Sequence, residues 1–529
     1  MTLPDSQPWY ARPRARAWLA AAAVGLFVFA LGAATDVGLG DESHHFRKAS
    51  LFLEAGRRLT CDPAYGPVVP PGWPYYDGAL WHAGLAILWW LTGTRSVLAA
   101  QAYQAAWVIL LLGCAWEAGR ALGGNRAAWW TLLAAAMPCV LFFGVLFYVE
   151  VAMMAFLALA AALAIRQHPL WSGLAFGLAF LVKPNVFLIW PAWFLGVLIA
   201  AGPGWRGRIV RGLLATLGTL VVAPDLAWRH VHLGTTGVVY LSLSGGDPSI
   251  PADVRAMLLA RGPETFYAPS SFWNPADLAM FLGVPAAVGL VLSLVRVRRL
   301  GRPVQVLWLL VAMFLAAWFA LMASDRVSEV RYLMPLFVVF ILLAGLALAD
   351  ACAASKRPAT ARPVAVPGWA AVLVALAVVQ ALAVGGFALQ KRRIDPAFLA
   401  AVRAVGRLEV HRPPGFVLCP EAMVMMYGGR PILWAAVNPG PFFFVWSPEK
   451  QWRILDYFGV AYIVVPRARV YDDAEVKHTG GFPKSYVDRL PGLPYVEREP
   501  AIDRGGLLVY RVRPLETARP PPSPAPPGT

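Results

Sequence analysis

The sequence predicts a polytopic α-helical membrane protein with a small α/β domain toward its C-terminus. Of the 529 residues, 58% are hydrophobic and only 14% are charged, and the mean hydropathy is +0.57. Soluble domains carry roughly a quarter charged residues. The apolar residues form runs long enough to cross a bilayer as helices, which takes about 20 residues. After residue 394 these runs give way to short apolar segments of strand length.

Eleven membrane crossings are predicted. The run 79–93 is left out of the count, because it is short and follows a proline-rich loop, and it is expected to lie in the interface. The predicted spans are 17–38, 97–117, 127–147, 148–166, 169–182, 184–203, 208–228, 277–295, 303–323, 331–350 and 366–389.

Clusters of arginine and lysine set the predicted orientation. Cytoplasmic loops are enriched in these residues, and every second loop of the eleven-span count is basic if Arg12, Arg14 and Arg16 lie inside. The N-terminus is therefore expected in the cytoplasm, and the loop 40–96 and the C-terminal domain outside it. The net charge of +16 comes from these basic loop clusters. They are short and lie between apolar runs, so they form no continuous basic surface, and nucleic-acid binding is excluded.

Three regions follow from these patterns. Residues 1–390 form the membrane domain, 394–515 a soluble domain in which strands and helices alternate, and 516–529 a disordered proline-rich tail. The soluble domain has no glycine-rich phosphate loop and no catalytic triad pattern, so it is expected to stabilise the protein or to serve the acceptor.

The first candidate site residues are Asp41 and Glu42, where the first apolar run ends. A carboxylate can take the proton from an acceptor hydroxyl within hydrogen-bond reach. The same pair also fits a plain helix end, and the residues alone leave both interpretations open. His44 and His45 follow, but their spacing matches no established metal-ligand pattern. We therefore predict no metal site.

Two more charged residues interrupt apolar sequence. Glu150 lies between two adjacent spans, and Lys183 precedes the helix-breaking Pro184. Charges in such places are costly unless they face a polar cavity or a partner. The partner of Lys183 is either the phosphate of a lipid or a carboxylate such as that of Glu150.

A turn before the span 331–350 and the first outer loop supply the remaining candidates. Arg326 and Arg331 offer the paired donors that fit phosphate oxygens, with Tyr332 beside them, although the charges of this turn also suffice to pair with each other. Three aromatic residues of the loop suit either stacking on a sugar or an interfacial belt. They are Trp73, Tyr75 and Tyr76.

In order and spacing, four segments resemble the GT-C superfamily of membrane glycosyltransferases, especially the family 39 type. They are the acidic pair after the first span, VVPPGWPYYDGALWHAGLAILWWLTG, FYVEVAMM, and LAFLVKPNV followed later by EVRYLMPLF. The DESHH and PPGW variants are similar to the dolichyl-phosphoglucose α-1,2-glucosyltransferase branch. The resemblance covers residues 17 to about 350.

The resemblance implies a polyprenyl-phosphate sugar as donor and a lipid, glycan or protein acceptor. It implies that Asp41 is the catalytic base and that Glu42 orients it or contacts the acceptor, while Glu150 stands where relatives usually carry Asp. It further implies that Lys183, Arg326 and Arg331 bind the donor phosphate, with support from Tyr332. The residues assigned to substrate binding are His44, His45, Trp73, Tyr75, Tyr76 and Glu150. The resemblance leaves a requirement for a divalent metal open, but no DxD pair near residue 41 supports one, so the cofactor is unknown.

Two other functions are consistent with a polytopic protein. A transporter or flippase of lipid-linked sugars places its charges near the bilayer midplane and often contains inverted repeats. Here the acidic residues gather at one face and no internal repeat is evident. A scaffold for envelope assembly would tolerate loss of Asp41, Lys183 or Arg331 without effect on any reaction.

Overall fold

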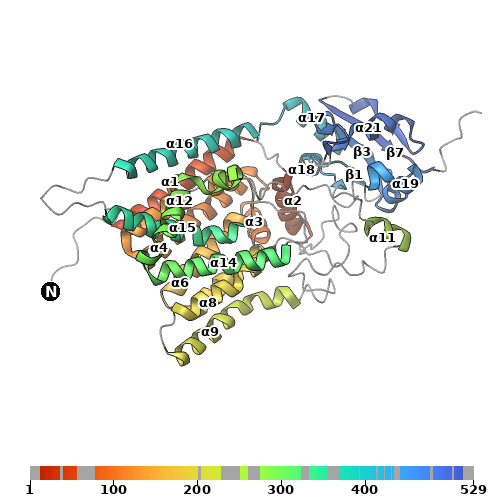
Figure 1. Cartoon of the computed structure of the whole chain (residues 1–529). Coiled ribbons are helices and arrows are strands. Elements are labelled where there is room, and N and C mark those ends of the chain that lie inside the picture. The colour runs from red at the N-terminus through yellow and green to blue at the C-terminus, as the bar shows by residue number, and fades with distance from the viewer. Residues whose placement is uncertain are drawn as a thin grey trace, which may run out of the picture.

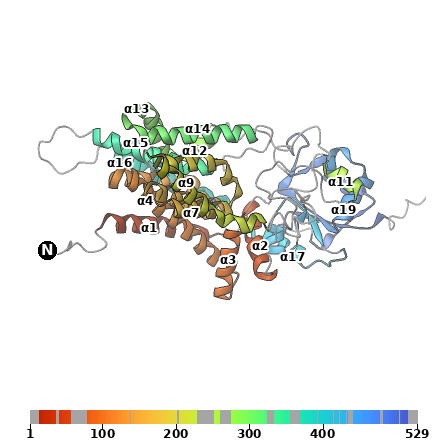
Figure 2. The same ribbon diagram turned by 90° about the horizontal axis from the view of Figure 1, so that it is seen from below.

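A computed structural model shows a bundle of helices at one end and a smaller domain containing a β-sheet at the other (Figure 1). Helix α1 starts at the end of the bundle remote from the sheet, and α2 lies between the bundle and the sheet domain (Figure 2). The structure describes residues 12–35, 40–55, 78–136, 138–200, 204–227, 251–259, 275–322, 333–354, 368–391, 393–412, 415–421, 423–430, 432–433, 441–476, 481–502 and 505–515.

Most of the described helices belong to the bundle. In its core, α6 packs between α4, α7 and α15, and both α6 and α15 are largely buried. The bundle helices are α1 (Pro13–Ala33), α2 (Gly40–Ala55), α3 (Ala79–Thr92), α4 (Val97–Ala135), α5 (Pro138–Val145), α6 (Glu150–Ile165), α7 (Pro169–Val182), the 3-10 helix η2 (Pro184–Ile189), α8 (Trp190–Ala200), α9 (Trp205–Thr219), the 3-10 turn η3 (Leu220–Val222), α12 (Pro275–Val295), α13 (Val297–Leu300), α14 (Arg302–Met322), α15 (Met334–Ala354) and α16 (Gly368–Lys391).

Five of the described helices are long and apolar enough to cross a membrane by length and composition. They are Pro13–Ala33, Val97–Ala135, Trp205–Ala227, Met334–Ala354 and Gly368–Gln390. Several other predicted spans are shorter apolar helices, such as α6 and α7. The chain is thus a mostly helical membrane protein, while the count of eleven crossings stays a prediction.

One predicted span and one predicted loop differ from the structure. The span 127–147 was wrong as a single helix, because α4 ends at Ala135 and α5 starts again at Pro138, a residue that cannot continue a helix. The loop predicted at 118–126 is a sharp reversal within α4, where Gly124 has φ +73°, a left-handed conformation that favours glycine. The break at Pro184 is confirmed, since η2 starts there.

The sheet domain is built on five strands in the order β2-β1-β3-β7-β6. Strands β2, β1 and β3 are parallel, and β7 is antiparallel to both β3 and β6. The strands of this sheet are β1 (Phe416–Leu418), β2 (Ile432–Leu433), β3 (Val460–Pro466), β6 (Val496–Arg498) and β7 (Leu507–Val512). Four of them, β1, β2, β3 and β7, coincide with the short apolar segments 415–419, 431–434, 461–466 and 507–512, which predict strands. All seven residues of β3 are buried, as a central strand requires.

The other elements of this domain cover or extend the sheet. They are α17 (Pro396–Gly406), α18 (Met423–Gly428), the π-helix η5 (Pro441–Val445), α19 (Pro448–Tyr457), the 3-10 turns η6 (Arg467–Arg469), η7 (Leu490–Gly492) and η8 (Pro500–Ile502), α21 (Lys484–Arg489), and the two-stranded pair β4 (Val470–Tyr471) and β5 (Phe482–Pro483).

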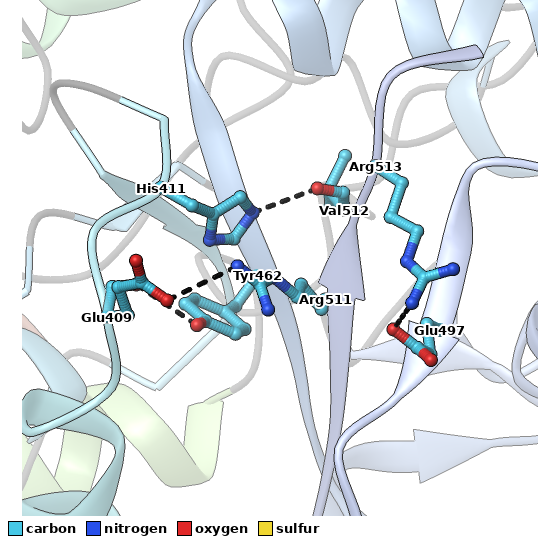
Figure 3. A network of polar contacts seen from close by, with 7 residues as sticks. All are labelled: Glu409, His411, Tyr462, Glu497, Arg511, Val512 and Arg513. Carbon is cyan, nitrogen blue, oxygen red and sulfur yellow. Dashed lines mark hydrogen bonds and ion pairs between the residues drawn. The ribbon is translucent and has the colours of Figure 1, made fainter. Parts of the chain in front are cut away.

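A polar network ties the segment after α17 to the sheet (Figure 3). The Tyr462 hydroxyl donates to the backbone oxygen of Glu409 at 3.0 Å, and the Glu409 carboxylate lies 3.4 Å from Arg511 on β7. His411 Nε2 and the carbonyl oxygen of Val512 are 3.0 Å apart. These contacts hold the segment between α17 and β1 against the sheet.

Two helices from outside the sheet domain pack against it. Helix α2 contacts α18, and α11 (Ala252–Leu259) contacts α19. Val254 of α11 is fully buried in the core of the sheet domain, and Arg453 Nε donates to an Asp253 carboxylate oxygen at 3.0 Å. This guanidinium lowers the pKa of Asp253. The sheet domain therefore touches the helix that carries the acidic pair.

Candidate active site

Helix α2 turns one polar face toward the protein interior. Glu42, His45 and Ala49 follow each other at helical spacing, and their relative exposures are 0%, 5% and 0%. The backbone of Asp41 and His44 belongs to the same helix, but their side chains lie outside the described residues. The structure thus brings two of the four predicted residues of this segment into a buried site.

His45 forms a buried pair with His82 of α3. His45 Nδ1 lies 3.0 Å from His82 Nε2, and His82 Nδ1 lies 3.2 Å from the carbonyl oxygen of Gly78. A carbonyl oxygen only accepts, so we assign the proton of neutral His82 to Nδ1. Its Nε2 then accepts from His45, which leaves Nε2 of a neutral His45 as an acceptor. Together the two rings orient one proton-accepting nitrogen.

Gly78 connects this histidine pair to Lys183. Its N–H donates to the carbonyl oxygen of Val182 at 2.7 Å, directly before Lys183 in the chain. A Cβ at this position would overlap the backbone carbonyl of Leu181. Only glycine allows α3 to approach the end of α7 this closely.

Gly78→Ala is therefore expected to destabilise the protein by about 3 kcal/mol, the upper end of the usual cost of overpacking, because a backbone carbonyl cannot move aside as a side chain can. Thermal unfolding of the detergent-solubilised protein measures this. Gly386→Ala on α16 is the control, since no atom lies within 4 Å of the point where its added methyl group would stand. That variant should match the parent or gain up to about 1 kcal/mol of helix propensity. Equal stability of the two variants would contradict the close approach.

Glu150 and Lys183 form a buried ion pair. Their relative exposures are 0% and 6%, and Lys183 Nζ donates to Glu150 Oε1. Glu150 is the first residue of α6 and Lys183 caps the C-terminal end of α7, so both helix dipoles favour the charge they meet. The carboxylate partner that the sequence left open for Lys183 is thus present. Within the described residues, Glu150 Oε2 is buried without a hydrogen-bond partner.

Two glutamines that the sequence analysis missed hold the turn before Glu150. Gln104 Nε2 lies 2.9 to 3.2 Å from the carbonyl oxygens of Phe143, Leu146 and Tyr148, and Gln101 Nε2 donates to that of Val145 at 3.0 Å. The turn is thereby fixed from α4. The sequence does indicate them, because two glutamines three residues apart interrupt the apolar run 97–117, and polar side chains in such runs usually have a buried partner.

The same glutamine joins the turn to α3. Trp81 Nε1 donates to Gln104 Oε1 at 3.2 Å, and Trp81 lies next to His82 in the chain. The ring centroids of Tyr148 and His45 are 6.0 Å apart. We call Glu42, His45, His82, Glu150 and Lys183 the polar cluster. Its residues come from α2, α3, the start of α6 and the end of α7; α3 contacts both α2 and α7, and α7 contacts α6. Helices α2 and α3 lie at the end of the bundle that faces the sheet domain (Figure 1).

The remaining predicted site residues lie outside the described part of the chain, and their roles stay predictions. They are Arg326, Arg331, Tyr332, Trp73, Tyr75 and Tyr76. Among the described residues, no group of three or more His, Cys, Asp and Glu side chains has an arrangement that holds a metal ion.

An apolar cavity of about 360 Å³ lies between α6, α8, α14 and α15. On α6 its lining starts at Leu157, seven residues or about two turns after Glu150. It continues to Ile165 and to Arg302 at the start of α14. Its other wall includes Pro335 near the start of α15. The cavity therefore extends from below the polar cluster toward the opposite end of the bundle.

Comparisons with known proteins identify the fold. No protein-family model and no curated protein sequence matches the chain. Apo ArnT from Cupriavidus metallidurans matches with a TM-score of 0.60 and 16% identity, over 95% of this chain and 99% of ArnT. The same protein bound to undecaprenyl phosphate gives 0.56 and 16%, over 93% and 97%.

A second kind of solved structure matches as well. It is the archaeal oligosaccharyltransferase AglB from Archaeoglobus fulgidus, in complex with an inhibitory peptide and a dolichol-phosphate. Its TM-score is 0.54 at 13% identity, and the match covers 94% of this chain and 74% of AglB. ArnT and AglB are both GT-C membrane glycosyltransferases. The chain has their fold, as the sequence resemblance implied.

Proposed function

From this GT-C fold we propose that the chain is an integral membrane glycosyltransferase. It moves a sugar from a polyprenyl-phosphate donor to an acceptor hydroxyl at the extracytoplasmic face. The observation that carries the proposal is the buried pair of Glu150 and Lys183 above an apolar cavity. A pair of charged side chains next to an apolar cavity suits a lipid whose phosphate headgroup lies at the charges and whose tail fills the cavity. The two GT-C proteins of similar structure were solved with such lipids.

The donor is held by its two chemically different ends. The isoprenoid tail occupies the apolar cavity, where burial contributes about 0.8 kcal/mol per CH₂. The phosphate lies near Lys183, together with Arg331 and Arg326, and Tyr332 supports it. In the sequence, Arg331 and Tyr332 come shortly before α15, whose Pro335 lies in the cavity wall. This order in the chain supports assigning them to the donor phosphate.

The reaction is an inverting displacement. The acceptor oxygen forms a bond to the anomeric carbon as Asp41 takes the hydroxyl proton. The bond from that carbon to the phosphate oxygen breaks, and polyprenyl phosphate leaves with the electron pair. Negative charge grows on the leaving phosphate, so cations aimed at it stabilise the transition state more than the ground state. Losing one such contact costs roughly 2–4 kcal/mol of activation free energy.

The polar cluster positions the acceptor. Glu42 orients Asp41, its neighbour on α2, and Glu150 Oε2 accepts a hydrogen bond from a sugar or acceptor hydroxyl. His45 accepts another at Nε2 and is held in that orientation by His82. Trp73, Tyr75, Tyr76 and His44 of the first outer loop complete the substrate site.

His82→Phe tests the positioning role, since it keeps an aromatic ring on α3 but removes the acceptor for His45. We expect kcat to fall by up to about tenfold, the value of one hydrogen bond, and the pH dependence of kcat to shift. His168→Phe, at the exposed start of α7, is the matched control and should change neither. A fall in kcat with an unchanged pH profile would contradict the positioning role and would show that His82 contributes only to the packing of α3.

The direct test of the function uses purified full-length protein and a panel of polyprenyl-phosphate sugars. The expected result is consumption of one donor, release of polyprenyl phosphate and appearance of a glycosylated acceptor. The donor that is consumed also shows whether the transferred sugar is a hexose or a pentose, and a repeat of the assay with a chelator shows any metal requirement. Movement of an intact donor across proteoliposomes without release of polyprenyl phosphate would instead support the transporter.

A further inference from the structure

A second pocket lies at the other end of the bundle, where α1 begins. Its volume is about 400 Å³, and α1, α4 and α6 form its walls. The residues that line it are Arg14, Glu117, Arg120, Ala121, Ile165 and Arg166. None of them belongs to the polar cluster, and none of the charged residues has a role in the proposed reaction.

The pocket is built around one buried carboxylate. Glu117 Oε1 lies 2.6 Å from Arg14 Nε, and Glu117 Oε2 pairs with Arg166. Arg120 follows Glu117 by three residues on α4 and has no carboxylate partner among the described residues. Its guanidinium lies over the ring of Trp116 at 5.4 Å from the centroid. Three arginines against one glutamate leave the pocket with a net charge of +2.

The acid lies at the floor of the pocket and the cations lie at its rim. The side chain of Glu117 is only 9% exposed, whereas those of Arg14 and Arg166 are 62% and 37% exposed. Arg120 is exposed as well. An anion that enters from solvent or from the lipid headgroups therefore meets guanidinium groups first. Their planar donors match the oxygens of a phosphate.

The pocket also adjoins apolar surface. Ile165 lines both this pocket and the apolar cavity, and the neighbours Arg166 and Gln167 line one each. Arg14 lies in the first turn of α1, the helix that starts at this end of the bundle. A headgroup site at a helix start, next to apolar surface, suits an amphiphile better than a free ion. Basic pockets between membrane helices bind anionic headgroups in this way.

We propose that this pocket binds the phosphate of an anionic phospholipid from the leaflet at this end of the bundle, with its chains against the apolar surface beside Ile165. The predicted orientation makes this the cytoplasmic leaflet. The headgroup site is separate from the site proposed for the donor phosphate, since Glu150 begins α6 whereas Ile165 and Arg166 end it. Failure of either proposal leaves the other intact.

Native mass spectrometry of the full-length protein tests the proposal with phosphatidylglycerol, phosphatidylcholine and inorganic phosphate as probes. The parent protein should bind phosphatidylglycerol about tenfold more tightly than phosphatidylcholine, and Arg120→Gln should reduce phosphatidylglycerol binding about tenfold. Arg120→Lys, which keeps the charge but loses the planar fork, should fall between the two. Because Arg120 is exposed and has no carboxylate partner among the described residues, these variants are expected to fold.

Arg298→Gln on α13 is the matched control. It removes one exposed arginine that lines neither cavity and should bind as the parent does. Undiminished binding of phosphatidylglycerol by Arg120→Gln would overturn the proposal, and so would equal binding of the two lipids by the parent. Full displacement of phosphatidylglycerol by millimolar inorganic phosphate would identify the ligand as a free ion and would overturn it too.

Discussion

Asp41→Asn is expected to abolish sugar transfer while the protein still folds and binds its donor. The amide keeps the size of the side chain but cannot take a proton from the acceptor hydroxyl. A positioned general base contributes about 10²–10⁴-fold to a rate, so transfer should fall to at most a hundredth of the parent value. Turnover of a radiolabelled polyprenyl-phosphate sugar measures the loss, and retention of the labelled donor measures binding.

The control for this variant is Asp488→Asn, which makes the same chemical change at an exposed position of the sheet domain. It should transfer sugar at the parent rate. Near-normal turnover by Asp41→Asn would remove Asp41 from the role of base. Loss of donor binding together with turnover would show that the residue serves the donor instead of the acceptor.

Lys183→Met is expected to destabilise the protein strongly and to stop transfer. Removing one partner of a buried pair leaves an uncompensated charge, which costs about 3–5 kcal/mol of stability. The double variant Glu150→Leu/Lys183→Met removes both charges, and apolar side chains of similar volume often replace a buried pair at little or no cost. Its stability should therefore return to within about 1 kcal/mol of the parent.

The double variant separates a structural pair from a functional one. If Lys183 stabilises the leaving phosphate, the double variant is stable and still inactive, with a loss of roughly 2–4 kcal/mol in activation free energy. Thermal unfolding in detergent and single-turnover assays supply the two readouts. A double variant that regains both stability and transfer would restrict the pair to holding α6 against α7.

Sequence patterns predicted the parts of this protein that depend on hydropathy and on proline. The apolar runs, and the proline that interrupts one of them, correctly indicated the positions of several elements. These are the helices α6 and α7, the break at Pro184 and the strands β1 and β3. The helices follow from local chemistry, because an apolar run in lipid has few alternatives to a helix. The ordered motifs between residue 17 and about 350 also indicated the fold.

The packing of the polar cluster could not be read in the same way. His82 is one polar residue in an apolar helix, and nothing local to it indicates that His45, 37 residues earlier, is its partner. Gln104 bonds three carbonyl oxygens about 40 residues away, and such contacts depend on how α4 and α5 meet. The contact of α2 (Gly40–Ala55) with α18 (Met423–Gly428) joins segments from opposite ends of the chain, which no local periodicity can predict.

The central claim is that a lipid phosphate binds beside the polar cluster, and an experimental structure with bound polyprenyl phosphate tests it most directly. The account predicts that a phosphate oxygen lies within hydrogen-bond distance of Lys183 Nζ, that the Asp41 carboxylate faces the same space, and that the tail runs into the cavity lined by Leu157 and Pro335. A phosphate bound elsewhere, or an Asp41 carboxylate directed away from it, would contradict the account.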